Sequence, residues 1–146
     1  MALGEQIIWG SVFMGLCLML ETGFLVWAST VLSRAGRRLS TPPTTLQIGW
    51  MMILALFFIV LAHTIQVLIW STIWTRYGAV SDWNEAIYFS LVTYTTVGYG
   101  DLTLGPGLRV FGTFAGVAGV LGFGISSAFL IAVMSRLLQA GMFGQD

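Results

Sequence analysis

The seven residues Thr95-Thr96-Val97-Gly98-Tyr99-Gly100-Asp101 have the clearest potential for chemistry in this chain. Two glycines flank one tyrosine, and glycine adopts left-handed backbone conformations that other residues resist. Such a loop can turn several backbone carbonyl oxygens towards one point, and oxygen is the ligand that hard cations prefer. Thr96 would add a hydroxyl oxygen. The segment therefore predicts a cation site made of backbone oxygens without fixed charge.

The composition is that of a membrane protein. Of the 146 residues, 57% are hydrophobic and 8% are charged, whereas a soluble domain carries about 25% charged residues. The formal net charge is zero, and the absence of a basic patch argues against nucleic acid as a partner. The sequence contains no CxxC, HExxH, phosphate-binding loop or nucleophile elbow, so we do not expect an enzyme.

Three segments are long enough to span a bilayer, which takes about 20 apolar residues. They cover approximately residues 7–32, 46–74 and 108–138. A fourth apolar segment, residues 82–95, is too short to span and fits a re-entrant helix surrounded by protein or a watery cavity. We therefore predict an all-α membrane protein with three transmembrane helices, a re-entrant pore helix and the glycine-tyrosine loop.

Arginines predict the orientation of these spans. Four of the six arginines lie after the first span or at the end of the third, and the other two lie on the opposite side: Arg34, Arg37, Arg38 and Arg136 against Arg76 and Arg109. The positive-inside rule makes the side with four arginines cytoplasmic. The N-terminus is then outside, the C-terminus is cytoplasmic, and the glycine-tyrosine loop opens on the outer face.

Aromatic residues near the predicted boundaries suggest interfacial anchors. Trp70, Trp74, Tyr77 and Trp83 are expected near the outer boundary, and Trp50 near the inner one. Rings at headgroup depth would hold the spans in place, and the alternative, for about a third of them, is that they are ordinary core aromatics.

The re-entrant helix begins with a capping signal. Asp82 occupies a plausible N-cap position, and Glu85 follows three residues later. Both acids suit the positive end of the helix dipole, and the negative end would point inwards, where it favours a cation.

Residues 88–101, ending in Thr-Val-Gly-Tyr-Gly-Asp, resemble the pore helix and selectivity filter of tetrameric potassium channels. Residues 118–124 are similar to the inner helix around the gating-hinge glycine of small bacterial potassium channels. The resemblance covers residues 46–138 and implies a pore domain there. Residues 1–45 would then form an additional N-terminal transmembrane helix and a cytoplasmic loop, and residues 139–146 a short cytoplasmic tail.

The resemblance implies a potassium channel that conducts K⁺ passively as a homotetramer in the cell membrane, with other copies of the chain and the lipid bilayer as its partners. It implies K⁺ sites at Thr96, Val97, Gly98 and Tyr99 and a gating hinge at Gly119. By helical spacing from the hinge, the cavity and gate face would hold Val120, Phe123, Ser127 and Ile131. Gly112 and Gly116 form a GxxxG pair that we assign to helix packing rather than to gating.

The support of the filter departs from part of the family. Certain bacterial channels carry a glutamate behind the filter, where this chain has Val92. A carboxylate pair with Asp101 is therefore unavailable, and we expect Asp101 to bond Tyr88 instead. Tyr88, Val92, Gly100 and Asp101 are thus the predicted supporting residues.

Two ionisable residues lie inside predicted spans. Glu21 is near the middle of the first span and His63 near the middle of the second. Ionisable groups within a membrane are functional candidates, and antiparallel spans bring these two to similar depths. They are candidates for a proton-dependent pair. Alternatively, Glu21 is protonated or faces another subunit, and His63 is a neutral core histidine.

Other functions remain open from sequence alone. The chain could be a pore-like subunit that needs a partner protein, a non-conducting membrane sensor, or a weakly selective cation channel. An unidentified regulatory protein is compatible with each of these functions. A complete Gly98-Tyr99-Gly100 filter favours the selective potassium channel.

Overall fold

The computed structural model describes residues 1–40 and 42–142, and this part of the chain folds into four helices without strands. They are α1 (Leu3–Gly36), α2 (Thr45–Arg76), α3 (Trp83–Tyr94) and α4 (Arg109–Met142). Three of them, α1, α2 and α4, are long and apolar enough to cross a membrane. The predicted all-α fold with three membrane-spanning helices and one short helix is confirmed.

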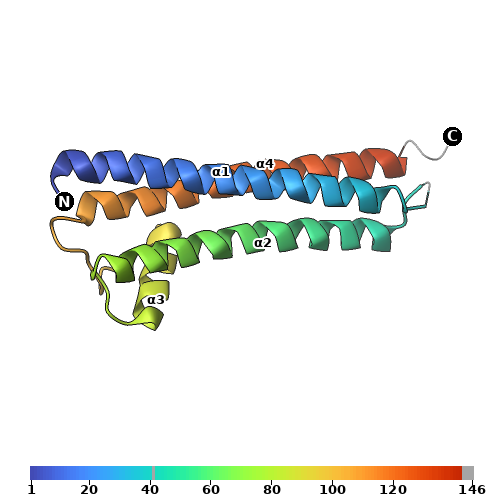
Figure 1. Cartoon of the computed structure of the whole chain (residues 1–146). Coiled ribbons are helices and arrows are strands. Elements are labelled where there is room, and N and C mark those ends of the chain that lie inside the picture. Colours follow the sequence, from blue (N-terminus) through green and yellow to red (C-terminus); the bar gives the residue numbers. More distant parts are fainter. Residues whose placement is uncertain (41, 143–146) are drawn as a thin grey trace.

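The three long helices run side by side, and α3 lies beside one end of α2 (Figure 1). The N-terminus is at the same end as α3, and the C-terminal end of α4 is at the opposite end. Helix α1 packs against both α4 and α2. The additional first helix is therefore part of the helical body.

Local capping determines where α2 begins. Thr44 is the N-cap, its hydroxyl accepts from the Gln47 amide at 3.3 Å, and the Gln47 side chain accepts from the Thr44 amide at 3.0 Å. This reciprocal pair is a capping box. At the other end of the chain, α4 continues beyond residue 138, so residues 139–142 of the predicted tail are helical. Thr41 in the predicted cytoplasmic loop and residues 143–146 of the predicted tail lie outside the described residues.

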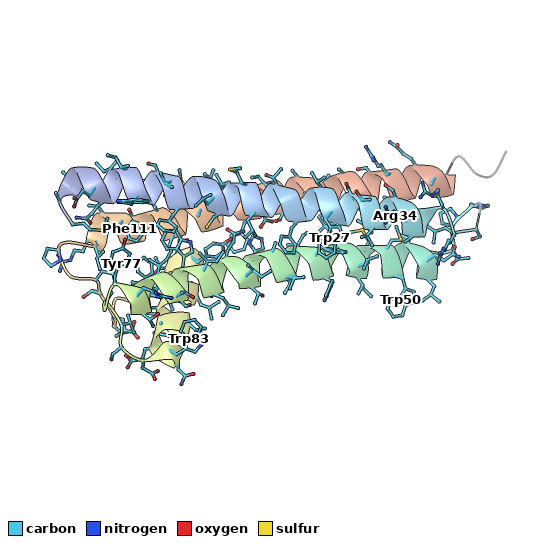
Figure 2. The ribbon with its side chains drawn as sticks, in the orientation of Figure 1. Trp27, Arg34, Trp50, Tyr77, Trp83 and Phe111 are labelled. Carbon is cyan, nitrogen blue, oxygen red and sulfur yellow. The ribbon has the colours of Figure 1, made fainter. Side chains whose placement is uncertain are left out.

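The largest apolar cluster lies at the α3 end of the body. Trp70 and Trp74 are fully buried and stacked with ring centroids 5.3 Å apart, and Phe111 from α4 packs on both. The prediction that these two tryptophans are interfacial anchors is therefore wrong, because rings of α1 and α4 cover Trp70 and rings of α3 and α4 cover Trp74. Tyr77 and Trp83 are exposed at this end (Figure 2).

A second apolar cluster closes the opposite end, around Leu32, Met51, Ala55 and Leu137. Trp50 lies at this end and is exposed (Figure 2). The two clusters are separated along the bundle, and buried polar side chains occupy the interval between them.

Helix α1 is fastened to the start of α4. The side chain of Gln6 is buried, and its Oε1 accepts from the amides of Val110 at 3.1 Å and Phe111 at 3.3 Å. These are amides of the first helical turn, which have no partner within the helix. Gly10 lets the two helices approach closely, since a Cβ there would come within 2.2 Å of the Phe114 ring.

Candidate functional site

Helix α3 is capped at its start and held by α2. Asp82 is its N-cap and accepts from the amides of Asn84 at 2.9 Å and Glu85 at 3.1 Å. In its middle, the buried hydroxyl of Ser71 on α2 bonds Ser90 at 2.9 Å and the Ala86 carbonyl at 3.3 Å. These contacts hold α3 in place against α2 and so position its C-terminal end, from which the glycine-tyrosine loop directly follows.

The loop after α3 has an unusual backbone. Positive φ angles occur at every second residue, with 60° at Thr96, 54° at Gly98 and 80° at Gly100. Glycine adopts such angles without penalty, but a β-branched residue does so only under strain. Strain of about 1–3 kcal/mol per residue typically persists at functional sites. The alternation therefore gives this segment a path unlike that of a β-strand, and the strained backbone at Thr96 makes it a candidate functional site.

One hydrogen bond returns the loop to the helix before it. The Gly98 amide donates to the Val92 carbonyl at 3.2 Å. Val92 thus supports the loop through its backbone, while its side chain lines a cavity of about 300 Å³ together with Gly98, Gly100 and Arg109. The space behind the loop holds no carboxylate among its lining residues.

Asp101, the last residue of the segment, is bonded to α3. The Tyr88 hydroxyl donates to Asp101 Oδ2 at 2.6 Å, so the structure brings the two predicted supporting residues together. This hydrogen bond is the main cause that lowers the pKa of Asp101 below its ordinary value and raises that of Tyr88 above its own. The contact spans the loop and links its C-terminal end to α3.

The loop is largely uncovered in a single chain. Val97 is 54% exposed and Tyr99 is 73% exposed, although both lie between two spans. A dehydrated ion needs oxygen ligands on all sides, and one chain supplies only one strip of them. The arrangement can coordinate a cation fully only if other chains complete the ring.

Glycines of α4 allow the C-terminal end of α3 to pack closely against this helix. A Cβ at Gly119 would lie 1.9 Å from the Tyr94 carbonyl oxygen, and one at Gly116 would lie 3.1 Å from the Thr93 carbonyl oxygen. A Cβ at Gly112 would come within 2.4 Å of Leu104. The predicted hinge glycine therefore has a packing role in this structure, whatever its role in motion.

The four predicted cavity residues are all exposed along α4: Val120, Phe123, Ser127 and Ile131. Val120 also lines a hollow of about 310 Å³ with Thr96, the first predicted ion ligand, and with Gly116. The hollow lies where the loop meets α4, so the face predicted to line a cavity is continuous with the loop.

The structure brings Glu21 and His63 together. Glu21 Oε1 lies 3.8 Å from His63 Nε2, and the Glu21 side chain is fully buried. Sequence reasoning missed the three side chains that bond them: Gln66, Tyr94 and Ser126. Gln66 follows His63 by one helical turn, a signal that could have indicated a shared face.

Three membrane-capable helices, a short capped helix between them and an oxygen-rich loop define an α-helical membrane protein of the channel type. A family model described as "Ion channel" matches residues 53–136, more than half of the chain. The protein therefore belongs to this ion channel family. No curated protein and no solved structure matches the chain. Helix α1 precedes the matched region.

Proposed function

We propose that the protein is a potassium-selective channel that passes K⁺ through a pore on the axis of a homotetramer. The observation that carries this proposal is the segment from Thr96 to Gly100, with positive φ at every second residue. Carbonyl oxygens of Thr96, Val97, Gly98 and Tyr99 would replace the hydration shell of the ion. Conduction is passive, so the K⁺ ion is the cargo and no reaction is catalysed.

Exposure supports the assembly. A closed cage of oxygens requires several copies of one strip, and cyclic homo-oligomers provide such symmetry. Val97 and Tyr99 are exposed in the single chain, as are Val120 and Ile131 on α4. Four copies around an axis would cover these faces and enclose both the filter and the cavity below it.

The end of α3 adds a favourable field. The negative end of its dipole, at Tyr94, is directed towards the start of the filter and stabilises a cation there. With the arginine-rich ends of the helices on the cytoplasmic side, the filter would open outwards and the C-terminus would lie in the cytoplasm of a multi-pass cell-membrane protein.

Reconstitution tests the proposal. The purified chain in liposomes should dissipate a K⁺ gradient and leave a Na⁺ gradient standing, and a native mass in detergent should correspond to four chains. Gly98→Ala should reduce the preference for K⁺, because an L-residue resists the φ of 54° there. Gly105→Ala is the matched control, since a Cβ at Gly105 meets no atom within 4 Å.

The outcomes separate the alternatives. Equal K⁺ and Na⁺ flux would identify a weakly selective cation channel. Absence of flux from a folded tetramer would identify a pore subunit that needs a partner protein or a non-conducting sensor. Either result would overturn the proposal.

A further inference from the structure

Five buried or mostly buried side chains from all four helices close a ring of hydrogen bonds. Gln66 Nε2 donates to Glu21 Oε2 at 2.7 Å, and the Tyr94 hydroxyl donates to Gln66 Oε1 at 3.1 Å. His63 Nδ1 lies 2.8 Å from the Tyr94 hydroxyl, and His63 Nε2 lies 3.2 Å from Ser126 Oγ. A bond between Ser126 and Glu21 Oε1 completes the ring.

Counting donors shows how many protons the ring holds. The Tyr94 hydroxyl has one hydrogen and gives it to Gln66, so it must accept from His63 Nδ1. If Ser126 donates to a Glu21 carboxylate, His63 Nε2 must also carry a hydrogen, and the pair is Glu⁻ with His⁺. If Glu21 is a carboxylic acid, it donates to Ser126, and Ser126 donates to neutral His63. Both arrangements satisfy every bond, contain the same number of protons and differ by one proton shifted through Ser126.

Losing or gaining a proton breaks the ring. With a Glu21 carboxylate and a neutral His63, the ring is one hydrogen short, so one of the contacts His63–Tyr94, His63–Ser126 or Ser126–Glu21 brings two acceptors together with no hydrogen between them. With a protonated Glu21 and a cationic His63, Ser126 accepts from both and its own hydrogen has no acceptor in the ring. Either state also leaves a net charge in a buried site within the membrane-spanning bundle, which is unfavourable.

Within residues 1–40 and 42–142, no other charged side chain lies on the middle turns of the helices that could replace the missing charge. Cys17 on α1, one turn from Glu21, is the other buried titratable group beside the ring. The charged residues of the four helices otherwise lie at or near the helix ends: Glu5, Arg34, Arg76, Glu85, Arg109 and Arg136. Protons can exchange through His63, whose side chain is 13% exposed while that of Glu21 is 0% exposed.

The ring is connected to both moving parts of a channel. Tyr94 is the last residue of α3 and immediately precedes the filter segment, and its carbonyl oxygen rests on Gly119 of α4. Ser126 lies two turns beyond Gly119 on the same helix. A bend at Gly119 or a shift of the filter base therefore has to stretch the ring or move α1 with it.

We infer that Glu21, His63, Gln66, Tyr94 and Ser126 form a proton-binding site through which α1 controls the filter base and the inner helix. The closed ring, in which Glu21 and His63 share one titratable proton, stabilises the conducting arrangement. Loss of that proton or uptake of a second one opens the ring and removes this stabilisation. This inference rests on the proposed channel function for its readout in flux, although the ring itself does not depend on that function.

The test is K⁺ flux from liposomes measured from about pH 5 to about pH 9. A bell-shaped profile is expected, with flux falling about fivefold on each side, the equivalent of one hydrogen bond of about 1 kcal/mol. Glu21→Gln keeps a donor towards Ser126 and an acceptor for Gln66 but cannot lose a proton. Its flux should therefore no longer fall at alkaline pH (the alkaline limb of the profile), while the fall at acid pH (the acid limb) remains. His63→Gln cannot take up a second proton and should lose the acid limb alone.

Glu5→Gln is the matched control, because it makes the same change on the same helix at its exposed end. It should keep the wild-type profile. Infrared spectra of the protein should also show a carboxyl band that changes with pH in the wild type and is missing in Glu21→Gln.

Two results would overturn the inference: a flat wild-type profile, or unchanged limbs in both ring variants. If no variant conducts at any pH but the Glu21 carboxyl band still titrates, the proton site stands and the proposed channel function fails.

Discussion

Gly119→Ala is the substitution whose consequence the structure defines most sharply. The added Cβ would lie 1.9 Å from the Tyr94 carbonyl oxygen, and Cβ atoms in proteins essentially never come closer than 3.0 Å to another heavy atom. The end of α3 or the α4 backbone must therefore move by about 1.1 Å. Backbone atoms form the contact, so no side-chain rotation can relieve it.

The expected magnitude follows from two opposing terms. Overpacking of this kind costs about 1–3 kcal/mol, while alanine is a better helix former than glycine by about 1 kcal/mol. Gly124→Ala on the same helix gains the helix propensity of alanine without the overpacking cost, because a Cβ at Gly124 meets no atom within 4 Å. The two variants should therefore differ in free energy of unfolding by about 1–3 kcal/mol per chain.

Thermal unfolding in detergent and ion flux from liposomes measure the two consequences. Gly119→Ala should melt below Gly124→Ala. The proposed preference for K⁺ over Na⁺ should also fall, because the Tyr94 carbonyl lies two residues before Thr96, and displacing the end of α3 would misplace this first predicted ion ligand. A pure hinge role for Gly119 predicts altered opening with selectivity intact. Equal stability and equal selectivity of the two variants would refute the packing argument.

Three further predictions concern the end of the protein that carries α3. Tyr88→Phe removes the donor to Asp101 and should make flux decay faster after a K⁺ gradient is applied, whereas Tyr77→Phe, the same change outside the filter, should not. The pKa of Asp101 lies below its ordinary 3.8, and that of Tyr88 lies above its ordinary 10.0. The Tyr88–Asp101 bond therefore contributes its full stability at pH values between these two ordinary pKa values. It loses that contribution only as pH falls through the lowered pKa of Asp101 or rises through the raised pKa of Tyr88. This is tested in the double variant with Glu21→Gln and His63→Gln, in which the hydrogen-bond ring itself no longer titrates. The rate at which its ion flux decays should be constant between about pH 5 and about pH 9, and a change within that window would contradict the role of the Tyr88–Asp101 bond. Gln6→Leu leaves two α4 amides without their acceptor and should lower the free energy of unfolding by about 1–3 kcal/mol, whereas Gln139→Leu at the exposed opposite end should have little effect on thermal unfolding.

Much of the fold was accessible from local sequence. Span number follows from the length of apolar runs, because the bilayer requires about 20 apolar residues. The start of α3 follows from Asp82, since an acid at the N-cap satisfies free amides wherever the helix is placed. The glycine-tyrosine loop follows from the spacing of Gly98 and Gly100, because glycine itself accepts positive φ at those positions.

The packing partners were not accessible in the same way. Membrane helices are apolar on all sides, so periodicity does not indicate which face is buried. Trp70 and Trp74 fit an interfacial belt in sequence, but in the folded chain α1 and α4 cover Trp70, and α3 and α4 cover Trp74. Gly119 matched a hinge by resemblance, and only the position of the Tyr94 carbonyl revealed its packing role.

The sequence by itself determined the class of protein, the three spans, the capped short helix and the glycine-tyrosine loop, because each depends on residues adjacent in the chain. Tertiary structure alone decided how Gln66, Tyr94 and Ser126 join Glu21 and His63. The physical reason is that these polar groups lie on four different helices, and each finds its hydrogen-bond partner only when the packing of α1 against α2 and α4 excludes both water and lipid from the site.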